Sequence, residues 1–367
     1  MRDASQPCVL NLESDTPHLP IFSHRADSHH FRETSRKWTI PKNLLVTRHF
    51  PVFKFSNHLT SLTLMINDRK AACVALNFVQ GIGPKMFENL LNRFSHPGAV
   101  IAESIEELCT IPRLTQKIAE AIHAINIDAV AAELAALEEV GITVHTVDEQ
   151  TYPPNLKSIP NPPSILFQSG KFLTDDTISI AIVGTRKPST TGVKLARELA
   201  LGLAKRGFTI VSGMALGIDT AAHRGALEAG GRTLAVLGSG IQVIYPRQNQ
   251  GLAEQIRHSG AVFSELKPNA PPASGTLMSR DRIVSGLSLA VIVVEANERS
   301  GSMDTAKQAQ KQGRKLFAVD NPSTGNQRLI AQGITSIAEV TESSLNWIAE
   351  KTIEGGNASK PSQMTLF

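Results

Sequence analysis

Glycine, serine and arginine residues gather in four short stretches of this sequence, each directly after a run of apolar residues. The stretches are 184–187 (Gly-Thr-Arg-Lys), 212–219 (Ser-Gly-Met-Ala-Leu-Gly-Ile-Asp), 238–240 (Gly-Ser-Gly) and 295–302 (Glu-Ala-Asn-Glu-Arg-Ser-Gly-Ser). Glycine lets a ligand approach the backbone closely, and an arginine side chain donates two parallel hydrogen bonds to a phosphate. Helix N-termini add backbone amides and a positive dipole. The four stretches therefore predict an anion-binding site.

The common nucleotide-binding fingerprints do not occur in these stretches. Residues 184–188 read Gly-Thr-Arg-Lys-Pro where a dinucleotide-binding protein has Gly-x-Gly-x-x-Gly, and the lone Gly-x-Gly at 238–240 follows a later apolar run. The sequence also lacks Gly-x-x-x-x-Gly-Lys-Ser/Thr. These departures disfavour NAD binding and P-loop nucleotide hydrolysis, and we expect neither cofactor nor metal.

Asp219 and His223 are the residues whose spacing is compatible with acid–base chemistry. They stand four residues apart at the expected start of a helix, where they lie on one face. The structural alternative, which we favour, is that Asp219 caps the helix and His223 packs or hydrogen-bonds nearby. Glu265 and Glu295 end apolar runs and are equally suited to pairing with arginines. The sequence therefore predicts no catalytic residue.

Residues 178–338 alternate between short apolar runs and helical patterns, which predicts a doubly wound, Rossmann-like α/β domain with a parallel sheet. Fully apolar runs are typical of parallel strands that are covered on both faces. The carboxyl ends of such strands meet at one edge of the sheet, where ligands bind. The expected strands are Ser179–Val183, Thr209–Val211, Thr233–Leu237, Ala261–Ser264, Ala290–Val294 and Lys315–Ala318, and the expected helices are Gly192–Arg206, Asp219–Ala229, Gln250–His258, Arg280–Leu287 and Ser302–Gln312.

A small helical domain is expected before this domain, over residues 65–140, where apolar residues recur at helical spacing. Residues 81–85 (Gly-Ile-Gly-Pro-Lys) resemble the hairpin of a helix-hairpin-helix (SAM-like) module, and 110–114 resemble a weaker copy. Hairpin amides of this kind can hold a nucleic-acid phosphate. A purely structural role is the favoured alternative, because residues 65–177 carry 8 basic and 14 acidic side chains.

The remaining segments are less regular. Residues 1–64 are expected to be an irregular or disordered leader, with Met65 as a candidate start of translation. Residues 141–177 are expected to be a proline-rich connector with short strands, in which the prolines at 153, 154, 160, 162 and 163 exclude a helix. Residues 339–367 are expected to form a short helix and a flexible tail.

Charge is distributed unevenly along the chain. The formal net charge of the 367 residues is +4, but residues 178–338 carry 19 basic and 10 acidic side chains. This excess of positive charge favours an anionic ligand on the Rossmann-like domain. No run of about 18 apolar residues is present, so we expect no membrane span and a cytoplasmic location.

Several motifs occur in an order that is similar to the DNA-processing protein A family (DprA, also called Smf). The resemblance covers roughly residues 71–338 and is specific through the order and spacing of its motifs. They are Val183-Gly184-Thr185-Arg186, Ser212-Gly213-x-Ala215-x-Gly217-Ile218-Asp219, Ala235-Val236-Leu237-Gly238-x-Gly240, Tyr245-Pro246-x-x-Asn249, Arg280-x-Arg282-Ile283-x-x-Gly286-Leu287-Ser288 and Val293-Val294-Glu295-Ala296-x-x-x-Ser300-Gly301-Ser302.

The resemblance implies a non-enzymatic protein that binds and protects single-stranded DNA, forms a homodimer and helps to load the RecA recombinase during natural transformation. It implies that arginines and glycine-loop amides contact DNA phosphates. The residues that match these motifs are Gly184, Thr185, Arg186, Gly213, Gly238, Ser239, Gly240, Arg280, Arg282, Ser300, Gly301 and Ser302.

The sequence departs from the family pattern beside its arginine motif. Members usually have Phe-Pro before this motif and Arg-Asn-Arg within it, where this chain has Leu277-Met278 and Arg280-Asp281-Arg282. The aromatic ring that stacks on a base is missing, and such stacking contributes roughly 1–3 kcal/mol per base. We therefore expect weaker DNA binding or a changed ligand. The alternative functions are a nucleotide-binding sensor and a nucleotide-hydrolysing enzyme on the same architecture.

The last five residues form a separate candidate interaction motif. Gln363, Leu366 and Phe367 follow a stretch rich in glycine and serine and resemble the Gln-x-x-Leu-Phe peptide that docks on the DNA-polymerase sliding clamp. Apolar side chains at the end of a tethered tail suit a partner's groove. The sliding clamp is therefore an expected partner of the tail.

Overall fold

The structure is a computed structural model that describes residues 69–354. The predicted leader over 1–64 and the predicted clamp-binding residues Gln363, Leu366 and Phe367 lie outside the described residues.

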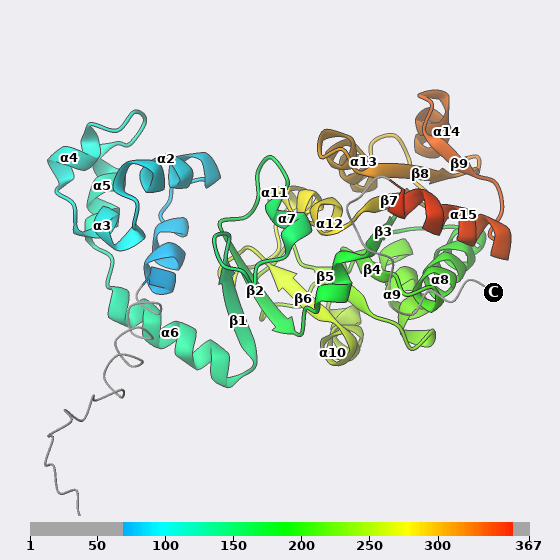
Figure 1. The fold of residues 1–367 in the computed structure, drawn as a ribbon, viewed down its shortest axis with the longest axis horizontal. Helices are drawn as coiled ribbons and strands as arrows, with labels where there is room; N and C mark the ends of the chain where they lie inside the picture. Colours follow the sequence, from blue (N-terminus) through cyan, green and yellow to red (C-terminus); the bar gives the residue numbers. More distant parts are fainter. Residues whose placement is uncertain (1–68, 355–367) are drawn as a thin grey trace, which may run out of the picture. The chain divides into compact units, whose positions relative to one another are not determined.

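Helices make up the first part of the described chain (Figure 1). The hairpin at 81–85 has the predicted geometry: Gly81 has a φ of +100°, Gly83 is the N-cap of α2, and Pro84 stands in its first turn. Apolar residues of these helices, among them Phe87 and Leu90, share one core. The helical segments are 69–77, α2 (Pro84–Phe94), α3 (Pro97–Ala102), α4 (Ile105–Cys109), α5 (Gln116–His123) and α6 (Ile127–Glu139).

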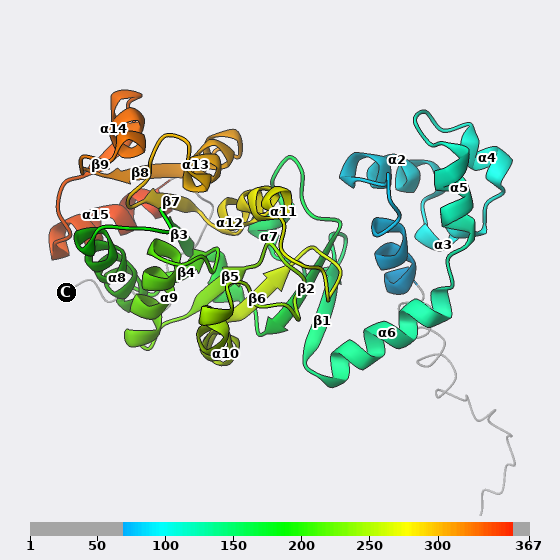
Figure 2. The same ribbon diagram turned by 180° about the vertical axis from the view of Figure 1, so that it is seen from behind.

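A nine-stranded sheet forms the centre of the α/β domain, with the strand order β1-β2-β6-β5-β4-β3-β7-β8-β9 (Figures 1 and 2). All neighbours from β6 to β9 pair in parallel, which confirms the predicted Rossmann-like fold. The strands are β1 (Ile142–Thr146), β2 (Ile165–Gly170), β3 (Ser179–Val183), β4 (Thr209–Ser212), β5 (Thr233–Val236), β6 (Ala261–Ser264), β7 (Ala290–Val293), β8 (Lys315–Val319) and β9 (Thr335–Ile337).

The segment 141–177, predicted as a connector with short strands, contains two strands, and these extend the sheet. Its strands β1 and β2 pair antiparallel, and β2 also pairs antiparallel with β6. This pairing covers an edge of β6 that would otherwise leave its backbone groups unpaired. The prediction that prolines exclude a helix here was wrong for one turn, α7 (Pro154–Lys157). Pro154 stands at the first helical position, where proline removes no intrahelical hydrogen bond.

Both faces of the sheet are buried, as the alternating side chains of β3 show. Ile180 and Ile182 join one core with α8 (Thr190–Lys205) and α9 (Ile218–Glu228). Ala181 and Val183 join a second core, to which α12 (Asp281–Leu287) and α13 (Gly301–Lys311) contribute. The other helices of this domain are α10 (Gln250–Ser259), α11 (Ser274–Ser279), α14 (Thr324–Ala331) and α15 (Glu342–Ile353).

The helix α15, predicted as a short helix outside the Rossmann-like domain, belongs to its core. Its residues Leu345 and Ile348 are buried in the same cluster as α8.

The direction in which successive strands are added to the sheet reverses between β3 and β7, which are neighbours in the sheet. From β3 the chain continues through α8 toward β4 and β5, whereas from β7 it continues through α13 toward β8 on the other side. Since α8 and α13 cover opposite faces, the loops after β3 and β7 diverge. A crevice forms at such a switch point, and ligands bind there in open α/β sheets.

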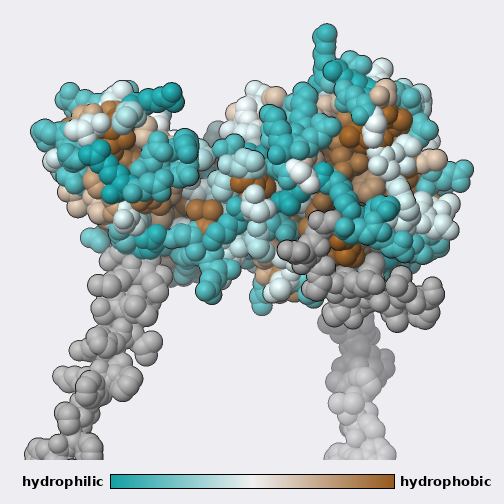
Figure 3. All heavy atoms as spheres, turned by 45° about the horizontal axis from the view of Figure 1, so that its top comes forward, coloured by the Kyte–Doolittle hydropathy of each residue, from teal (hydrophilic) through white to brown (hydrophobic). Residues whose placement is uncertain are grey.

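Charged and polar residues predominate on the face of the molecule that Figure 3 shows. None of the helices in the described part of the chain is long and apolar enough to cross a membrane.

Candidate anion-binding site

A cavity of about 580 Å³ opens at the switch point between β3 and β7. Four segments line it: the loops after β3, β4 and β7, and the chain from α11 into α12. Its lining residues are Val183, Gly184, Thr185, Arg186, Lys187, Ala215, Asp219, Ser274, Leu277, Met278, Arg280, Asp281, Asn297, Arg299, Ser300, Gly301, Ser302, Asp304 and Thr305.

The loop after β3 is held against its neighbours by the backbone. The Thr185 amide donates a hydrogen bond of 2.7 Å to the Glu295 carbonyl, and Gly184 permits this approach because a Cβ there would lie 2.9 Å from the same oxygen. The Glu295 carboxylate accepts hydrogen bonds from the amide and hydroxyl of Ser189, directly before α8. This anchoring leaves the side chains of Arg186 and Lys187 exposed at the cavity.

The loop after β7 presents the N-terminus of α13 to the cavity. Ser300 is the N-cap, and no side chain of the described residues caps this helix. A Cβ placed on Gly301 would meet only Asp281 Oδ2, at 3.9 Å, so the backbone of Gly301 is open on the cavity side. The first amides of a helix and its dipole favour an anion at this position.

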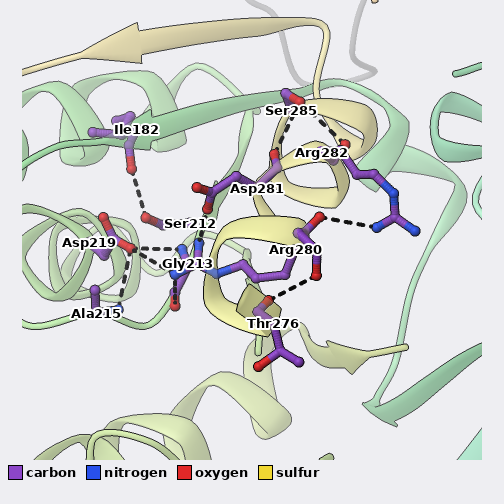
Figure 4. Close-up of polar contacts among 11 residues, drawn as sticks. Ile182, Ser212, Gly213, Ala215, Asp219, Thr276, Arg280, Asp281, Arg282 and Ser285 are labelled. Atoms are coloured by element: carbon purple, nitrogen blue, oxygen red, sulfur yellow. Dashed lines mark hydrogen bonds and ion pairs between the residues drawn. The ribbon is translucent and has the colours of Figure 1, made fainter. Parts of the chain in front are cut away.

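Arg280 reaches from α11–α12 to the loop after β4 and is buried (Figure 4). Its Nη2 donates a hydrogen bond of 2.8 Å to the Gly213 carbonyl, and its Nη1 lies 3.2 Å from Asp281 Oδ1. Nη2 also lies 3.9 Å from Asp219 Oδ2. A Cβ on Gly213 would lie 1.6 Å from Arg280 Nη1, so any other residue there would displace the guanidinium.

Asp219 stabilises the loop after β4 through hydrogen bonds and does not cap α9. Its Oδ2 accepts hydrogen bonds from the amides of Gly213 (3.1 Å) and Ala215 (3.3 Å), which precede the helix (Figure 4). Burial raises the pKa of Asp219, against the opposing effect of the Arg280 guanidinium and these amides. The prediction that Asp219 caps the helix was therefore wrong, because its carboxylate is taken up by amides of the preceding loop.

His223 does not form an acid–base pair with Asp219. Its Nδ1 lies 2.7 Å from the hydroxyl of Thr233 on β5, and the ring is fully buried. Burial is the main cause that lowers the pKa of His223 to about 3, so the ring is neutral at pH 7. The favoured structural interpretation of His223 agrees with this environment.

The structure brings together seven of the twelve predicted phosphate-binding residues at the cavity: Gly184, Thr185, Arg186, Arg280, Ser300, Gly301 and Ser302. Gly213 lies next to them, in contact with the Arg280 guanidinium. Gly238, Ser239 and Gly240 do not line the cavity. Close packing explains the two glycines, because a Cβ on Gly238 would lie 2.7 Å from Leu277 Cα and one on Gly240 would lie 2.2 Å from the Lys267 carbonyl oxygen.

Arg282, the twelfth predicted residue, lies outside the cavity. Its guanidinium donates two hydrogen bonds to the Glu265 carboxylate, of 2.6 and 2.9 Å. Figure 4 shows its side chain directed away from that of Arg280. This ion pair engages two of the five N–H donors of the guanidinium and offsets its positive charge. The alternative role that the sequence offered for Glu265, a partner for an arginine, is confirmed.

Lys187 and Arg299 line the cavity but were not among the predicted site residues. Like Arg186, both side chains are exposed, and none of the three forms an ion pair with any residue between 69 and 354. Their position in the sequence could have identified both residues, since Lys187 lies in the stretch 184–187 and Arg299 in the stretch 295–302. Met278, also at the cavity, is 54% exposed.

No group of three or more metal-ligating side chains occurs among the residues that the structure describes. Together, the Rossmann-like fold, the switch-point cavity, its exposed cations and the open end of α13 define an α/β protein with a candidate anion-binding site.

Comparison with known proteins identifies the family. The family described as DNA recombination-mediator protein A matches residues 143–348, and the SAM-like helix-hairpin-helix tandem matches residues 75–124. The chain belongs to the DNA recombination-mediator protein A family. Both the predicted resemblance and the predicted helix-hairpin-helix domain are thereby confirmed, and a DNA-processing role is supported.

Two bacterial proteins of known name are similar in sequence to this chain. The DNA processing protein DprA of Bacillus subtilis is 40% identical over 227 residues, which cover 60% of this chain and 73% of that protein. The protein Smf of Escherichia coli is 39% identical over 219 residues, or 58% of this chain and 59% of that protein.

Two solved structures share the fold. DprA of Streptococcus pneumoniae matches with a TM-score of 0.63 at 28% identity, over 77% of this chain and 96% of that chain. DprA of Helicobacter pylori, described for its single-stranded DNA binding mode, matches with a TM-score of 0.52 at 31% identity, over 57% of this chain and 96% of that chain.

Proposed function

We propose that this protein binds the phosphate backbone of single-stranded DNA in the switch-point cavity. The observation that carries the proposal is the convergence of three exposed cations, Arg186, Lys187 and Arg299, on the open N-terminus of α13. Such groups attract a polyanion and donate hydrogen bonds to its phosphate oxygens. The Helicobacter pylori relative, described as binding single-stranded DNA, supports this choice of polyanion.

The bases are held less strongly than the backbone. Leu277 and Met278 line the cavity at the position where the family resemblance implies Phe-Pro. A flexible thioether packs on apolar surface but has no aromatic face to stack on a base. The protein therefore binds DNA with little preference for base sequence and with a strong dependence on salt.

The protein acts as a mediator without catalysing a reaction. In support, Asp219 is engaged by loop amides and His223 by Thr233, so the two do not form an acid–base pair. As part of a recombination-mediator family, it protects single-stranded DNA and helps to load the RecA recombinase, as a homodimer in the cytoplasm. The tail residues Gln363, Leu366 and Phe367 dock on the sliding clamp.

The experiment that tests this function measures the affinity for a fluorescent oligo(dT) as a function of salt concentration. Each phosphate contact contributes about 0.7 to the slope of log affinity against log salt for single-stranded DNA. We expect Arg186→Ala and Arg299→Ala each to reduce this slope by roughly 0.7 and to weaken binding. The matched control is Lys194→Ala, which removes an exposed cation on α8 that does not line the cavity.

Equal slopes for Arg186→Ala, Arg299→Ala and Lys194→Ala would refute the site. A protein that binds free nucleotides but not the oligonucleotide would instead be a sensor, and product formation in the same titration would identify a hydrolase.

A further inference from the structure

Two carboxylates share a single guanidinium at the floor of the cavity. Asp219 and Asp281 both lie next to Arg280, and all three residues are about 95% buried. If both carboxylates are ionised, the cluster carries one excess negative charge in a region of low dielectric constant. Such an arrangement favours a proton on one of the two acids.

The hydrogen bonds identify Asp281 as the acid that takes the proton. Asp219 accepts two backbone amides, from Gly213 and Ala215, and these stabilise its ionised form. Asp281 lies 3.2 Å from Arg280 Nη1, and no amide of residues 69–354 donates a hydrogen bond to its carboxylate. Burial is the main cause that raises the pKa of Asp281, to about 7.

Asp281 also lies at the position where an incoming phosphate meets α13. Among residues 69–354, its Oδ2 is the atom that a Cβ on Gly301 would meet, at 3.9 Å. The charged groups that act on its carboxylate are Arg280 beside it, Asp219 on α9, Asp304 in the first turn of α13, and Arg186 in the loop after β3. An ionised Asp281 therefore opposes an anion at the α13 N-terminus, whereas a protonated Asp281 can donate a hydrogen bond to it.

We propose that Asp281 is protonated whenever the cavity holds a phosphate, so that above neutral pH binding of the DNA backbone is coupled to uptake of a proton by the protein. This inference rests on the proposed function, since it concerns the same cavity. It gives the aspartate within Arg280-Asp281-Arg282 a role: this residue sets the pH range in which the cavity accepts phosphate.

The coupling predicts a characteristic pH dependence. Below pH 7 the free protein already carries the proton, so the affinity is constant. Above pH 7 the bound phosphate retains the proton that the free protein has lost, so the affinity falls by up to about tenfold per pH unit. In Asp281→Asn the amide cannot ionise, and the affinity stays constant across the whole range and exceeds that of the wild type at the alkaline end.

The experiment titrates oligo(dT) and, separately, inorganic sulfate into the full-length protein by isothermal calorimetry between about pH 5.5 and 8.5, at constant ionic strength. Neither a phosphodiester nor sulfate ionises in this range, so a pH dependence reports on the protein. Using two buffers with different ionisation enthalpies gives the number of protons taken up. The matched control is Asp304→Asn, which removes another carboxylate from the cavity wall.

We expect uptake of up to about one proton per bound ligand at the alkaline end for the wild type and for Asp304→Asn, and none for Asp281→Asn. Equal proton uptake by the wild type and Asp281→Asn, or none by either, would overturn the inference. If sulfate binds with this proton uptake but oligo(dT) does not bind, the proposed function fails and the coupling stands. If neither probe binds, both proposals fail.

Discussion

The ion pair between Arg282 and Glu265 offers a direct test of how the arginines divide their roles. Its two hydrogen bonds of 2.6 and 2.9 Å join side chains that are only 16% and 17% exposed. Removal of one partner from a buried pair costs about 3–5 kcal/mol, because the other charge is left without compensation. Since some solvent reaches this pair, we expect Arg282→Ala to lower the free energy of unfolding by about 3 kcal/mol.

The assay combines urea denaturation with oligo(dT) binding under conditions where each variant is folded. In the double variant Arg282→Ala/Glu265→Ala no unpaired carboxylate remains, so we expect it to be more stable than Arg282→Ala alone. Both variants should bind the oligonucleotide within about twofold of the wild type if Arg282 makes no phosphate contact. Arg186→Ala is the comparison, because loss of this exposed side chain should change stability by less than about 0.5 kcal/mol while weakening binding.

A stable Arg282→Ala variant with lost DNA affinity would refute this reasoning. It would mean that Arg282 contacts phosphate, as the sequence motif had implied.

Two further predictions concern stability. Because the pKa of Asp281 is raised from 3.8 to about 7 in the folded state, the folded protein holds a proton that the unfolded chain has lost. As the pH rises from 5 to 7, the unfolding free energy of the wild type should therefore fall by up to about 1.4 kcal/mol per pH unit. This contribution is absent from Asp281→Asn, so its unfolding free energy should fall less over the same range. Identical pH profiles of the two proteins in urea would contradict the assignment. Gly184→Ala places a Cβ 2.6 Å from the Ile218 side chain and should destabilise the protein by about 1–3 kcal/mol, whereas Gly301→Ala should keep stability and weaken oligo(dT) binding. Equal thermal stabilities of the two alanine variants would count against the packing role of Gly184.

The sequence predicted the parallel sheet well because local composition decides it. Buried parallel strands such as β7 read as continuous apolar runs whichever strand they pair with. The role of β2 was not predictable in this way, since its place in the sheet depends on β6, about one hundred residues later in the chain. The prolines that precede β2 and its short apolar run therefore suggested a connector.

The candidate site was predicted to a similar degree, and for a similar reason. Glycine marks close approach, but the residue type does not say whether a ligand or the protein itself approaches. Gly301 faces open space, whereas Gly240 faces the carbonyls of Lys267 and Pro268. Likewise, the motifs of Arg186 and Arg282 both predict a phosphate contact. In the structure, Arg282 forms an ion pair with Glu265, whereas the side chain of Arg186 is exposed at the cavity.

The diverging loops after β3 and β7 have a consequence for how this protein family can change. The hollow between them arises from the direction of the backbone, since α8 and α13 cover opposite faces of the sheet. Replacement of a side chain on its wall leaves the hollow in place and changes only its chemistry. Met278 and Asp281 lie on this wall where the family resemblance implies other residues, so the same hollow presents a different chemistry on an unchanged scaffold.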